Sequence, residues 1–358
     1  MSTPVSTLHD LLARAPKALL HDHLDGGLRP ESVIELAREY KYTGLPTTDV
    51  VDLQKWFHRG AKRNDLVLYL ETFAHTVAVM QHRDAIERVA FECAQDLAAD
   101  NVVYAEVRFA PELNTDAGLA LDEVVRAVLE GFRRGAAGTN LTIYTILCAM
   151  RTAARSSEIA QLAVKFRDEG VVGFDIAGAE AGHPPTRHLD AFQLVQRENF
   201  HSTIHAGEAF GLPSIWEALQ FCGAERLGHG VRIVDDITGE PGHERLGRLA
   251  EYVLVRRIPL ELCPTSNVNT GVCKSIAEHP VGMLRRLRFR VTLNTDNRLM
   301  SNTSMTREFT QCADAFGWTL DDFQWITVNS VKSAFAHFEE RLKIINEVVK
   351  PRYAALCR

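Results

Sequence analysis

Eight short runs of β-forming residues alternate with helical segments along this chain of 358 residues. Short runs rich in valine, isoleucine and threonine and bounded by turn residues are typical of buried parallel strands. The runs are Ala18–His23, Val102–Phe109, Ile143–Met150, Val171–Ile176, Ser202–His205, Arg226–His229, Pro259–Cys263 and Arg290–Asp296. Eight strand–helix repeats favour a (β/α)8 barrel, the TIM barrel, over an open doubly wound sheet.

The segments between the runs have helical patterns. Helices are predicted over Ser156–Glu169, Leu212–Cys222 and Glu244–Arg257. About 75 residues separate the first two strands, more than one crossover helix needs, and they include a predicted helix over Asp84–Ala99. The C-terminal segment Arg307–Leu356 is also predicted to be helical. We therefore predict a single barrel domain over residues 1–358, with additional helices inserted after the first strand and at the C-terminus.

Composition excludes several classes of protein. The net charge of −6, from 40 basic and 46 acidic residues, argues against a partner that is a nucleic acid. The longest uncharged stretch is too short to span a bilayer, and the N-terminal sequence MSTPVSTLHDLLARAPKALL lacks the pattern of a secretory signal. Seven cysteines without C-x-x-C spacing are typical of reduced thiols. We expect a cytoplasmic protein that binds no membrane. The sequence leaves its oligomeric state open.

Ionisable residues stand at the ends of four predicted strands. His21 and His23 end the first strand and, two positions apart, project to the same face. The fifth strand ends at His205, the sixth at His229 and the eighth at Asp296. In a barrel, the C-terminal strand ends meet at the face that carries active sites. Nitrogen and oxygen donors suit a divalent transition metal ion, and zinc is the expected one, while cobalt, nickel and iron stay open.

Glu208 adds a carboxylate three residues beyond His205, in the segment HAGE. Because Ala-Gly follows a strand, this segment is a turn, and the helical spacing of H-E-x-x-H proteases does not apply. A glutamate beside a metal-bound water is a natural general acid or base. The other histidines, for example His58, His75, His183 and His279, are expected to be solvated or to cap helices.

Six motifs occur in the order HDHLDG, DIAGAE, HAGE, LGHG, CPTSN and LNTDN. Together they resemble the adenosine deaminase family of the amidohydrolase superfamily, in particular its bacterial branch, from about Pro16 to the C-terminal helices. The ordered set is far more specific than any one motif. The resemblance implies a hydrolase of purine salvage. Such an enzyme converts adenosine and 2′-deoxyadenosine to inosine and 2′-deoxyinosine and releases ammonia.

The resemblance also implies roles for the matching residues. The metal ligands would be His21, His23, His205 and Asp296. Metal-bound hydroxide would attack C6 while Glu208 protonates N1, and His229 would orient the metal water and take its proton. Dinuclear members of the superfamily bridge two metals with a lysine at the end of the fourth or third strand. No lysine ends either strand here, so the resemblance implies one metal ion per chain.

The implied substrate contacts are His23, Asp25, Gly178 and Asn297. The backbone amide of Gly178 would hold N3, and Asp25 would accept a hydrogen bond from the ribose 5′-hydroxyl. Because that carboxylate would repel a phosphate, the expected partner is a nucleoside rather than AMP. Asn297 replaces an aspartate that contacts N7 in many family members. Its amide donates without the protonation that an aspartate needs.

An apolar stripe after Asp65 has two readings. Leu66, Tyr69, Leu70 and Phe73 follow helical spacing, with Asp65 as a possible N-cap. In the family the matching helix covers the nucleoside, so the stripe is either such a lid or ordinary core packing.

Three alternative functions stay open at this point. The chain could deaminate another 6-aminopurine, hydrolyse a cyclic amide or ester, or be a barrel retained only for binding. A comparison of the turnover of adenosine, adenine and AMP distinguishes adenosine deamination from the first alternative. Release of ammonia rather than opening of a ring distinguishes it from the second. A content of about one metal ion per chain argues against the third.

Overall fold

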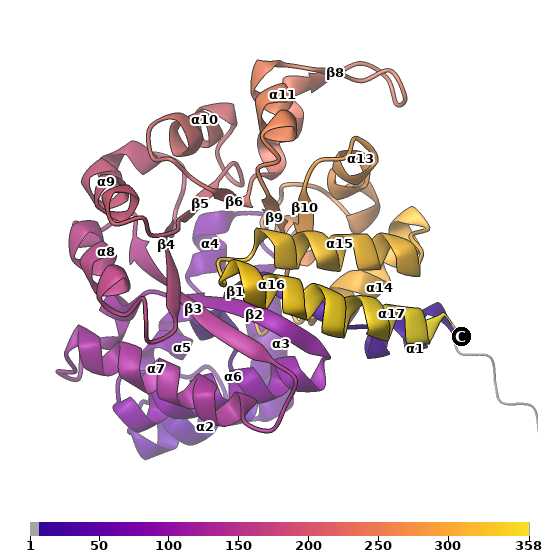
Figure 1. Ribbon diagram of the computed structural model, residues 1–358. Helices are drawn as coiled ribbons and strands as arrows, with labels where there is room; N and C mark the ends of the chain where they lie inside the picture. Colours follow the sequence, from indigo (N-terminus) through magenta and orange to yellow (C-terminus); the bar gives the residue numbers. More distant parts are fainter. Residues whose placement is uncertain (1–6, 358) are drawn as a thin grey trace, which may run out of the picture.

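Eight parallel strands form a closed barrel in the computed structural model, which describes residues 7–357. The strands are β1 (Lys17–His23), β2 (Val102–Phe109), β3 (Thr142–Met150), β4 (Val171–Ala177), β5 (Thr203–Ala206), β6 (Arg226–His229), β9 (Leu260–Leu262) and β10 (Val291–Leu293). They pair in the orders β1-β2-β3-β4 and β10-β9-β6-β5. Parallel bridges between Asp22 and Asp296 and between Phe174 and Ser202 join the two sheets at both edges. The predicted (β/α)8 barrel is confirmed (Figure 1).

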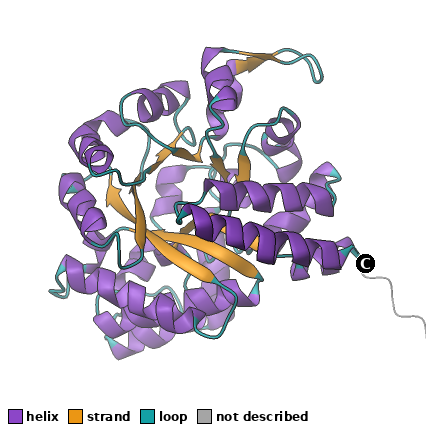
Figure 2. Ribbon diagram, in the orientation of Figure 1, coloured by secondary structure: helices purple, strands orange, loops and turns teal. Residues whose placement is uncertain are grey.

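Helices surround the barrel (Figures 1 and 2). The insertion after β1 contains α2 (Pro30–Glu39), α3 (Val50–Ala61), α4 (Leu66–Leu70), α5 (Phe73–Ala78) and α6 (Arg83–Ala99). Later strands are followed by α7 (Leu121–Ala136), α8 (Ser156–Lys165), α9 (Leu189–Arg197), α10 (Leu212–Gln220), α11 (Arg248–Val255), α12 (Pro264–Asn269) and α13 (Val281–Arg286). The C-terminal helices are α14 (Met305–Phe316), α15 (Leu320–Ser333), α16 (Phe338–Lys343), a π-helical segment Ile344–Val349 and α17 (Lys350–Leu356). The N-terminal α1 (Leu8–Arg14) packs against α14 and α15.

Three predicted element boundaries are wrong by three residues or more, and one of them is the end of the helix predicted over Ser156–Glu169, since α8 ends at Lys165. The last strand ends at Leu293 rather than Asp296, and Asp296 itself has a φ of +58°, in the left-handed region outside the β range. The helix predicted from Glu244 begins at Arg248 instead. Residues 237–246 form a hairpin of β7 (Ile237–Thr238) and β8 (Arg245–Leu246), and the Asp236 carboxylate accepts the Leu249 N–H at the new helix start.

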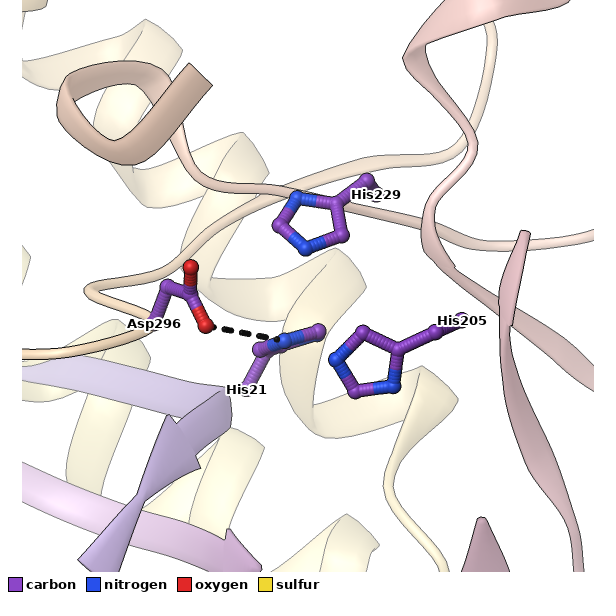
Figure 3. Close-up of side chains that lie close together, drawn as sticks. All are labelled: His21, His205, His229 and Asp296. Carbon is purple, nitrogen blue, oxygen red and sulfur yellow. Dashed lines mark ion pairs between the residues drawn. The ribbon is translucent and has the colours of Figure 1, made fainter. Parts of the chain in front are cut away.

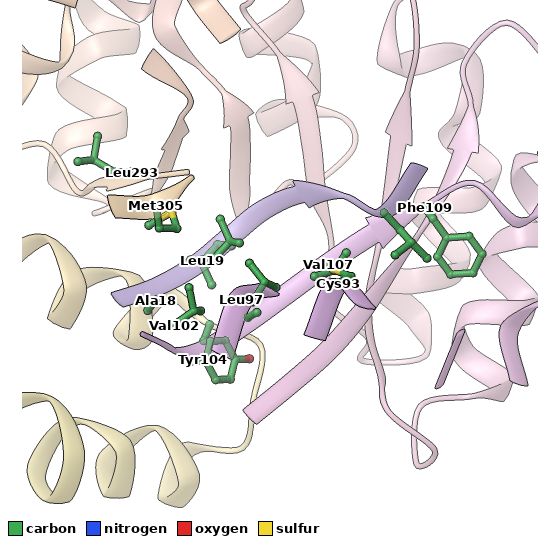
Figure 4. Packing of buried hydrophobic residues seen from close by; sticks show 14 of the residues in the cluster. Ala18, Leu19, Cys93, Leu97, Val102, Tyr104, Val107, Phe109, Leu293 and Met305 are labelled. Atoms are coloured by element: carbon green, nitrogen blue, oxygen red, sulfur yellow. The ribbon is translucent and has the colours of Figure 1, made fainter. Parts of the chain in front are cut away.

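Buried hydrophobic side chains fill the space between the strands and the helices. Residues of β1, β2 and α6, among them Leu19, Val107 and Leu97, pack together in this layer (Figure 4). No helix in the described part of the chain is long and apolar enough to cross a membrane. All seven cysteines lie within it and are free thiols. Residues 1–6, the start of the segment assessed for a targeting signal, lie outside the described range.

The interior of the barrel carries charges instead of a purely apolar core. Arg108 on β2 contacts the carboxylates of Asp175 on β4, at 2.6 Å, and Glu261 on β9, at 2.8 Å. Arg226 on β6 contacts Glu261 and Glu106, both at 2.6 Å. All five side chains are fully or almost fully buried. Each charge is therefore paired, as burial requires, and the pairs tie strands from opposite sides of the barrel.

Candidate active site

The five ionisable residues predicted at strand ends converge at the carboxyl-terminal mouth of the barrel. Ring nitrogens of three histidines and an oxygen of one aspartate lie within 4.8 Å of one another. These four residues are His21, His205, His229 and Asp296 (Figure 3). The Nε2 atom of His23 is also close, 3.2 Å from His205 Nε2 and 3.5 Å from Asp296 Oδ1. The group whose four ligand atoms lie within 4.8 Å of one another thus contains His229, whereas the sequence resemblance implied His23.

This donor set fits a divalent metal ion. The Nε2 atom of His21 is buried, has no hydrogen-bond partner among the described residues, and lies 3.4 Å from Asp296 Oδ1. A buried nitrogen without a partner is costly, and a cation between these atoms would satisfy it. Burial, assisted by the charge of Arg108, lowers the pKa of His21 to about 4. The imidazole is therefore neutral, as a metal ligand must be. The cluster could bind one metal ion.

Two carboxylates of the barrel interior orient the histidines. Glu261 lies 2.9 Å from Nδ1 of His21, and Asp175 lies 2.8 Å from Nδ1 of His205. Each contact turns the opposite ring nitrogen, Nε2, toward the cluster. Burial opposes the ionisation of Glu261, but Arg108 and Arg226 hold its pKa well below the usual range. Sequence analysis missed these partners, although charged residues inside β-rich runs were a visible sign.

Two residues of the cluster have strained backbones. His229 and Asp296 both have a φ of +58°, in the left-handed region that non-glycine residues rarely occupy. Such a conformation costs about 1–3 kcal/mol and persists where the surroundings enforce it, most often at functional sites. For Asp296, the backbone N–H donates to the His21 carbonyl and the carbonyl accepts from His23 N–H, which ties it to β1. Strain thus coincides with the predicted site.

Glu208 lies beside the cluster. Its Oε2 atom is 3.5 Å from His229 Nε2, and its Oε1 atom accepts a hydrogen bond from the Thr270 hydroxyl at 3.0 Å. The side chain is buried, and burial raises its pKa although His229 opposes the shift. A carboxyl group in this setting retains a proton at a higher pH than usual. It is therefore suited to act as a general acid.

A cavity of about 420 Å³ opens above these residues, within the range typical of small-molecule sites. All four predicted substrate contacts line it: His23, Asp25, Gly178 and Asn297. One oxygen of Asp25 and the side-chain oxygen of Asn297 have no hydrogen-bond partner among the described residues. Burial raises the pKa of Asp25 to about 7. These atoms are available to a polar ligand.

Gly26 makes the position of Asn297 possible. A Cβ atom at Gly26 would lie 2.0 Å from Asn297 Oδ1, far closer than atoms can approach. Only glycine at this point allows the asparagine side chain to stand where it lines the cavity.

The apolar stripe also lines the cavity, through Leu66, Tyr69, Leu70 and Phe73. Asp65 is the N-cap of α4, as predicted, and accepts from Leu68 N–H at 2.9 Å. The expectation of one continuous helix is wrong, since α4 ends at Leu70 and α5 begins at Phe73. Between them the Thr72 hydroxyl donates to the Tyr69 carbonyl at 2.7 Å, which competes with helical bonding.

Comparison with known proteins is consistent with this site. Residues 16–351 match the sequence model of the family described as adenosine deaminase. Adenosine deaminase 1 of Streptomyces coelicolor is 64% identical over 353 residues, which cover 97% of this chain and 89% of that protein. The chain belongs to the adenosine deaminase family. Another member, adenosine deaminase of Mycobacterium sp. strain KMS, is 61% identical over 362 residues and 99% of each chain.

Solved structures of this fold include the adenine deaminase of Arthrobacter aurescens. It matches with a TM-score of 0.82 and 23% identity, over 94% of this chain and 98% of that one. At this identity the likeness concerns the fold alone. It confirms the fold over nearly the whole chain.

In the present chain, Glu180 fixes the loop that carries Glu208. Its carboxylate accepts hydrogen bonds from four consecutive backbone N–H groups at 2.6–3.0 Å, those of Gly207, Glu208, Ala209 and Phe210. Glu180 is buried, so these bonds are shielded from water. Sequence analysis singled out its motif, DIAGAE, but assigned no role to this residue. The sequence feature that could have pointed to this role was the Glu180 carboxylate, for which the motif offers no charged partner.

Proposed function

We propose that this chain is an adenosine deaminase that converts adenosine and 2′-deoxyadenosine to inosine and 2′-deoxyinosine with release of ammonia, in purine salvage. The observation that carries the proposal is the buried Glu208 carboxyl, which stands 3.5 Å from His229 beside the histidine and aspartate cluster, at the base of a cavity of small-molecule size. A proton source and a metal-type donor set side by side suit hydrolysis at a ring carbon.

The proposed metal is one Zn²⁺ ion, held by His21, His23, His205 and Asp296. When bound, zinc lowers the pKa of a coordinated water from 15.7 to about 7 and so supplies a hydroxide nucleophile at neutral pH. The chain's part is to orient the ligands. Glu261 and Asp175 fix the ring nitrogens of His21 and His205 that face away from the cluster.

Glu208 is the proposed general acid. Adenine C6 is a poor electrophile while the ring stays aromatic, and a proton delivered from the Glu208 carboxyl to N1 makes C6 electrophilic. The raised pKa of Glu208 favours the protonated form that this step needs. The oxygen of the attacking water bonds to C6, one of its protons passes to the Glu208 carboxylate, and the other passes to the amino group, which leaves as ammonia as the C6–N bond breaks. His229, on the other side of the carboxyl, is the proposed residue that orients the attacking water.

Three contacts would select a nucleoside. The Gly178 amide would hold N3, the Asn297 amide would donate to N7, and Asp25 would accept from the ribose 5′-hydroxyl. A phosphate beside Asp25 would cost several kcal/mol at an effective dielectric of about 20 whenever the Asp25 carboxyl is ionised. Leu66, Tyr69, Leu70 and Phe73 line the other wall and are proposed as a lid over the nucleoside.

The chain is further proposed to work as a single barrel domain over residues 1–358 in the cytoplasm. Seven free thiols, six of them at least partly buried, support a reducing compartment. A nucleoside is the only partner that the cavity chemistry requires.

The test is to mix the purified chain with adenosine and follow inosine by absorbance and ammonia by a coupled assay. Parallel reactions with adenine and with AMP measure selectivity, and metal analysis should give about one ion per chain. Preferred turnover of adenosine supports the proposal. Ring opening, preferred turnover of adenine or AMP, or no ammonia release from a metal-loaded chain would overturn it.

A further inference from the structure

A chain of three hydrogen bonds runs behind His229, away from the cavity. The Val281 backbone N–H donates to His279 Nδ1 at 3.0 Å. His279 Nε2 contacts Asn267 Oδ1 at 3.1 Å, and Asn267 Nδ2 contacts His229 Nδ1 at 3.1 Å. His279, Asn267 and His229 are all buried, with 2%, 0% and 1% of their surface exposed. His279, expected to be solvated or capping, caps the first residue of α13 from within the core.

The chemistry of the first link sets the direction of the others. A backbone N–H can only donate, so His279 Nδ1 must accept and carries no proton. A neutral imidazole then has its proton on Nε2, which donates to the Asn267 carbonyl oxygen. Burial lowers the pKa of His279 to about 3, which keeps it neutral. With its oxygen occupied, Asn267 presents its NH₂ group to His229, whose Nδ1 must accept.

We propose that His279 and Asn267 are positioning residues that hold His229 as the tautomer with its proton on Nε2. This inference rests on the proposed function and revises one role in it. In this tautomer His229 faces Glu208 and the metal cluster as a hydrogen-bond donor. It orients the attacking water by donating to it and has no free Nε2 lone pair with which to take a proton.

The same tautomer decides between two candidate ligands. The four donors that lie within 4.8 Å of one another include His229, whereas the sequence resemblance implied His23. A ring nitrogen that carries a proton cannot bind a metal ion. With Nδ1 of His229 occupied by Asn267 and Nε2 protonated, His23 is the fourth ligand, since its Nε2 lies 3.2 Å from His205 Nε2.

The proton on His229 can be observed directly. The full-length chain, labelled with ¹⁵N-histidine and loaded with zinc, gives two-bond ¹⁵N–¹H spectra that distinguish the two tautomers, with His229→Gln to assign the signals. The expected result is a protonated Nε2 and a bare Nδ1. In Asn267→Asp a carboxylate can only accept, so Nδ1 becomes protonated. Spectra in which Nε2 of wild-type His229 carries no proton, because the proton is on Nδ1 or because zinc is bound to Nε2, overturn the proposal. An Nδ1 that stays unprotonated in Asn267→Asp also overturns it.

Matched variants separate positioning from packing. Asn329→Asp buries a carboxylate on α15, away from the site, and should leave the His229 signals unchanged. If Asn267 acted by shape alone, the nearly isosteric Asn267→Asp would keep activity and Asn267→Ala would lose it. Positioning predicts a loss in Asn267→Asp as well, with its kcat about 10–100-fold below wild type and its KM within about twofold. Full kcat in Asn267→Asp counts against it.

Failure of the proposed function gives a different pattern. A wild-type chain that binds zinc and shows the Nε2-protonated His229 but releases no ammonia from adenosine refutes the proposed reaction and leaves the tautomer assignment intact. An active wild-type chain with the opposite tautomer refutes the positioning role alone.

Discussion

The two halves of the barrel differ in strand length and in what they contribute. Strands β1–β4 have seven to nine residues each, whereas β5, β6, β9 and β10 have three or four. Short strands pass early into loops, where conformations outside the β region are available. Glu208, and the left-handed His229 and Asp296, all belong to the short-strand half. The long-strand half supplies the longer strand pairs, and the short-strand half supplies most of the chemical groups.

The halves are coupled through buried ion pairs that cross the barrel. Arg108 and Glu106 come from β2 in the long-strand half, and Glu261 and Arg226 come from β9 and β6 in the short-strand half. Because both carboxylates and both guanidinium groups are buried, breaking one pair leaves an uncompensated charge. The comparison therefore predicts that loop residues control turnover, while the crossing pairs control stability and metal affinity.

Glu208→Gln should have the largest effect on turnover. The amide cannot deliver a proton to N1, so kcat should fall by about 10²–10⁴-fold while metal content stays near one ion per chain. Steady-state kinetics and metal analysis measure both. Glu225→Gln, an exposed residue paired with His201, serves as the control and should keep full activity. Near-normal turnover in Glu208→Gln would show that Glu208 is not the general acid and that the short-strand half does not supply that group.

Glu261→Gln should instead damage stability and metal affinity. It leaves Arg108 and Arg226 partly uncompensated and costs about 3–5 kcal/mol of unfolding free energy. Loss of the strong acceptor at His21 Nδ1 should weaken zinc binding by about 10–100-fold. Denaturant unfolding and competition with a chelator measure these. The exposed pair of Glu130 with Arg133 gives the contrast, since Glu130→Gln should change stability by less than about 1 kcal/mol. Equal losses in both variants would contradict the coupling.

The convergence of the site was predictable because the barrel itself brings strand ends together. Once the eight runs were recognised, His21 and His205 had to meet at one face, whatever the details of packing. The last strand ends before Asp296, contrary to the prediction. The residue still reaches the cluster, because its backbone is hydrogen-bonded to β1 beyond the end of the strand. Errors of a few residues in an element therefore did not displace the site.

Partner choice was not predictable in the same way. That Glu261 supports His21, or that Asn267 contacts His229, depends on which barrel strands and loops are neighbours in space and on side-chain direction. The tautomer of His229 depends on a backbone N–H about 50 positions away in the sequence, at Val281. No periodicity or spacing carries that information. Motifs identify groups that do chemistry, while their protonation state is a property of the packed interior.

Glu308 on an outer helix contributes to the stability of the short-strand half in a way that depends on pH. On α14, it accepts from Thr265 N–H just after β9 and from the Thr303 hydroxyl, and burial raises its pKa to about 7. Between pH 4.5, its ordinary pKa, and pH 7 the folded state binds a proton that the unfolded state has lost. The unfolding free energy therefore falls as pH rises through this window, by up to about 3 kcal/mol from this group.

Glu308→Gln removes that titration. Urea unfolding at pH 5 and pH 7.5 should give a smaller decrease in unfolding free energy for the variant than for wild type. Titration of the histidine cluster is common to both proteins and cancels in the comparison. Glu339→Gln, an exposed change on α16, should keep the wild-type difference. A variant whose stability falls as much as wild type would show that Glu308 is ionised throughout.

Asn297→Ala should have the smallest effect, on binding alone. Loss of one hydrogen bond to N7, worth about 1 kcal/mol, should raise KM for adenosine by about fivefold and leave kcat nearly constant. Gly26→Ala should act similarly, because its Cβ would lie 2.0 Å from the asparagine oxygen and displace that side chain. Asn346→Ala, an exposed change in the π-helical segment, is the control.

Asn297→Asp sharpens this result. A carboxyl group donates to N7 only when protonated, so KM should rise with pH in Asn297→Asp but not in wild type, whose amide donates at every pH. The slope of KM against pH separates loss of a donor from loss of shape, since aspartate and asparagine have nearly the same size. Identical slopes in both proteins would show that N7 of the purine ring does not contact residue 297. The one selectivity contact that the short-strand half is proposed to make would then be absent.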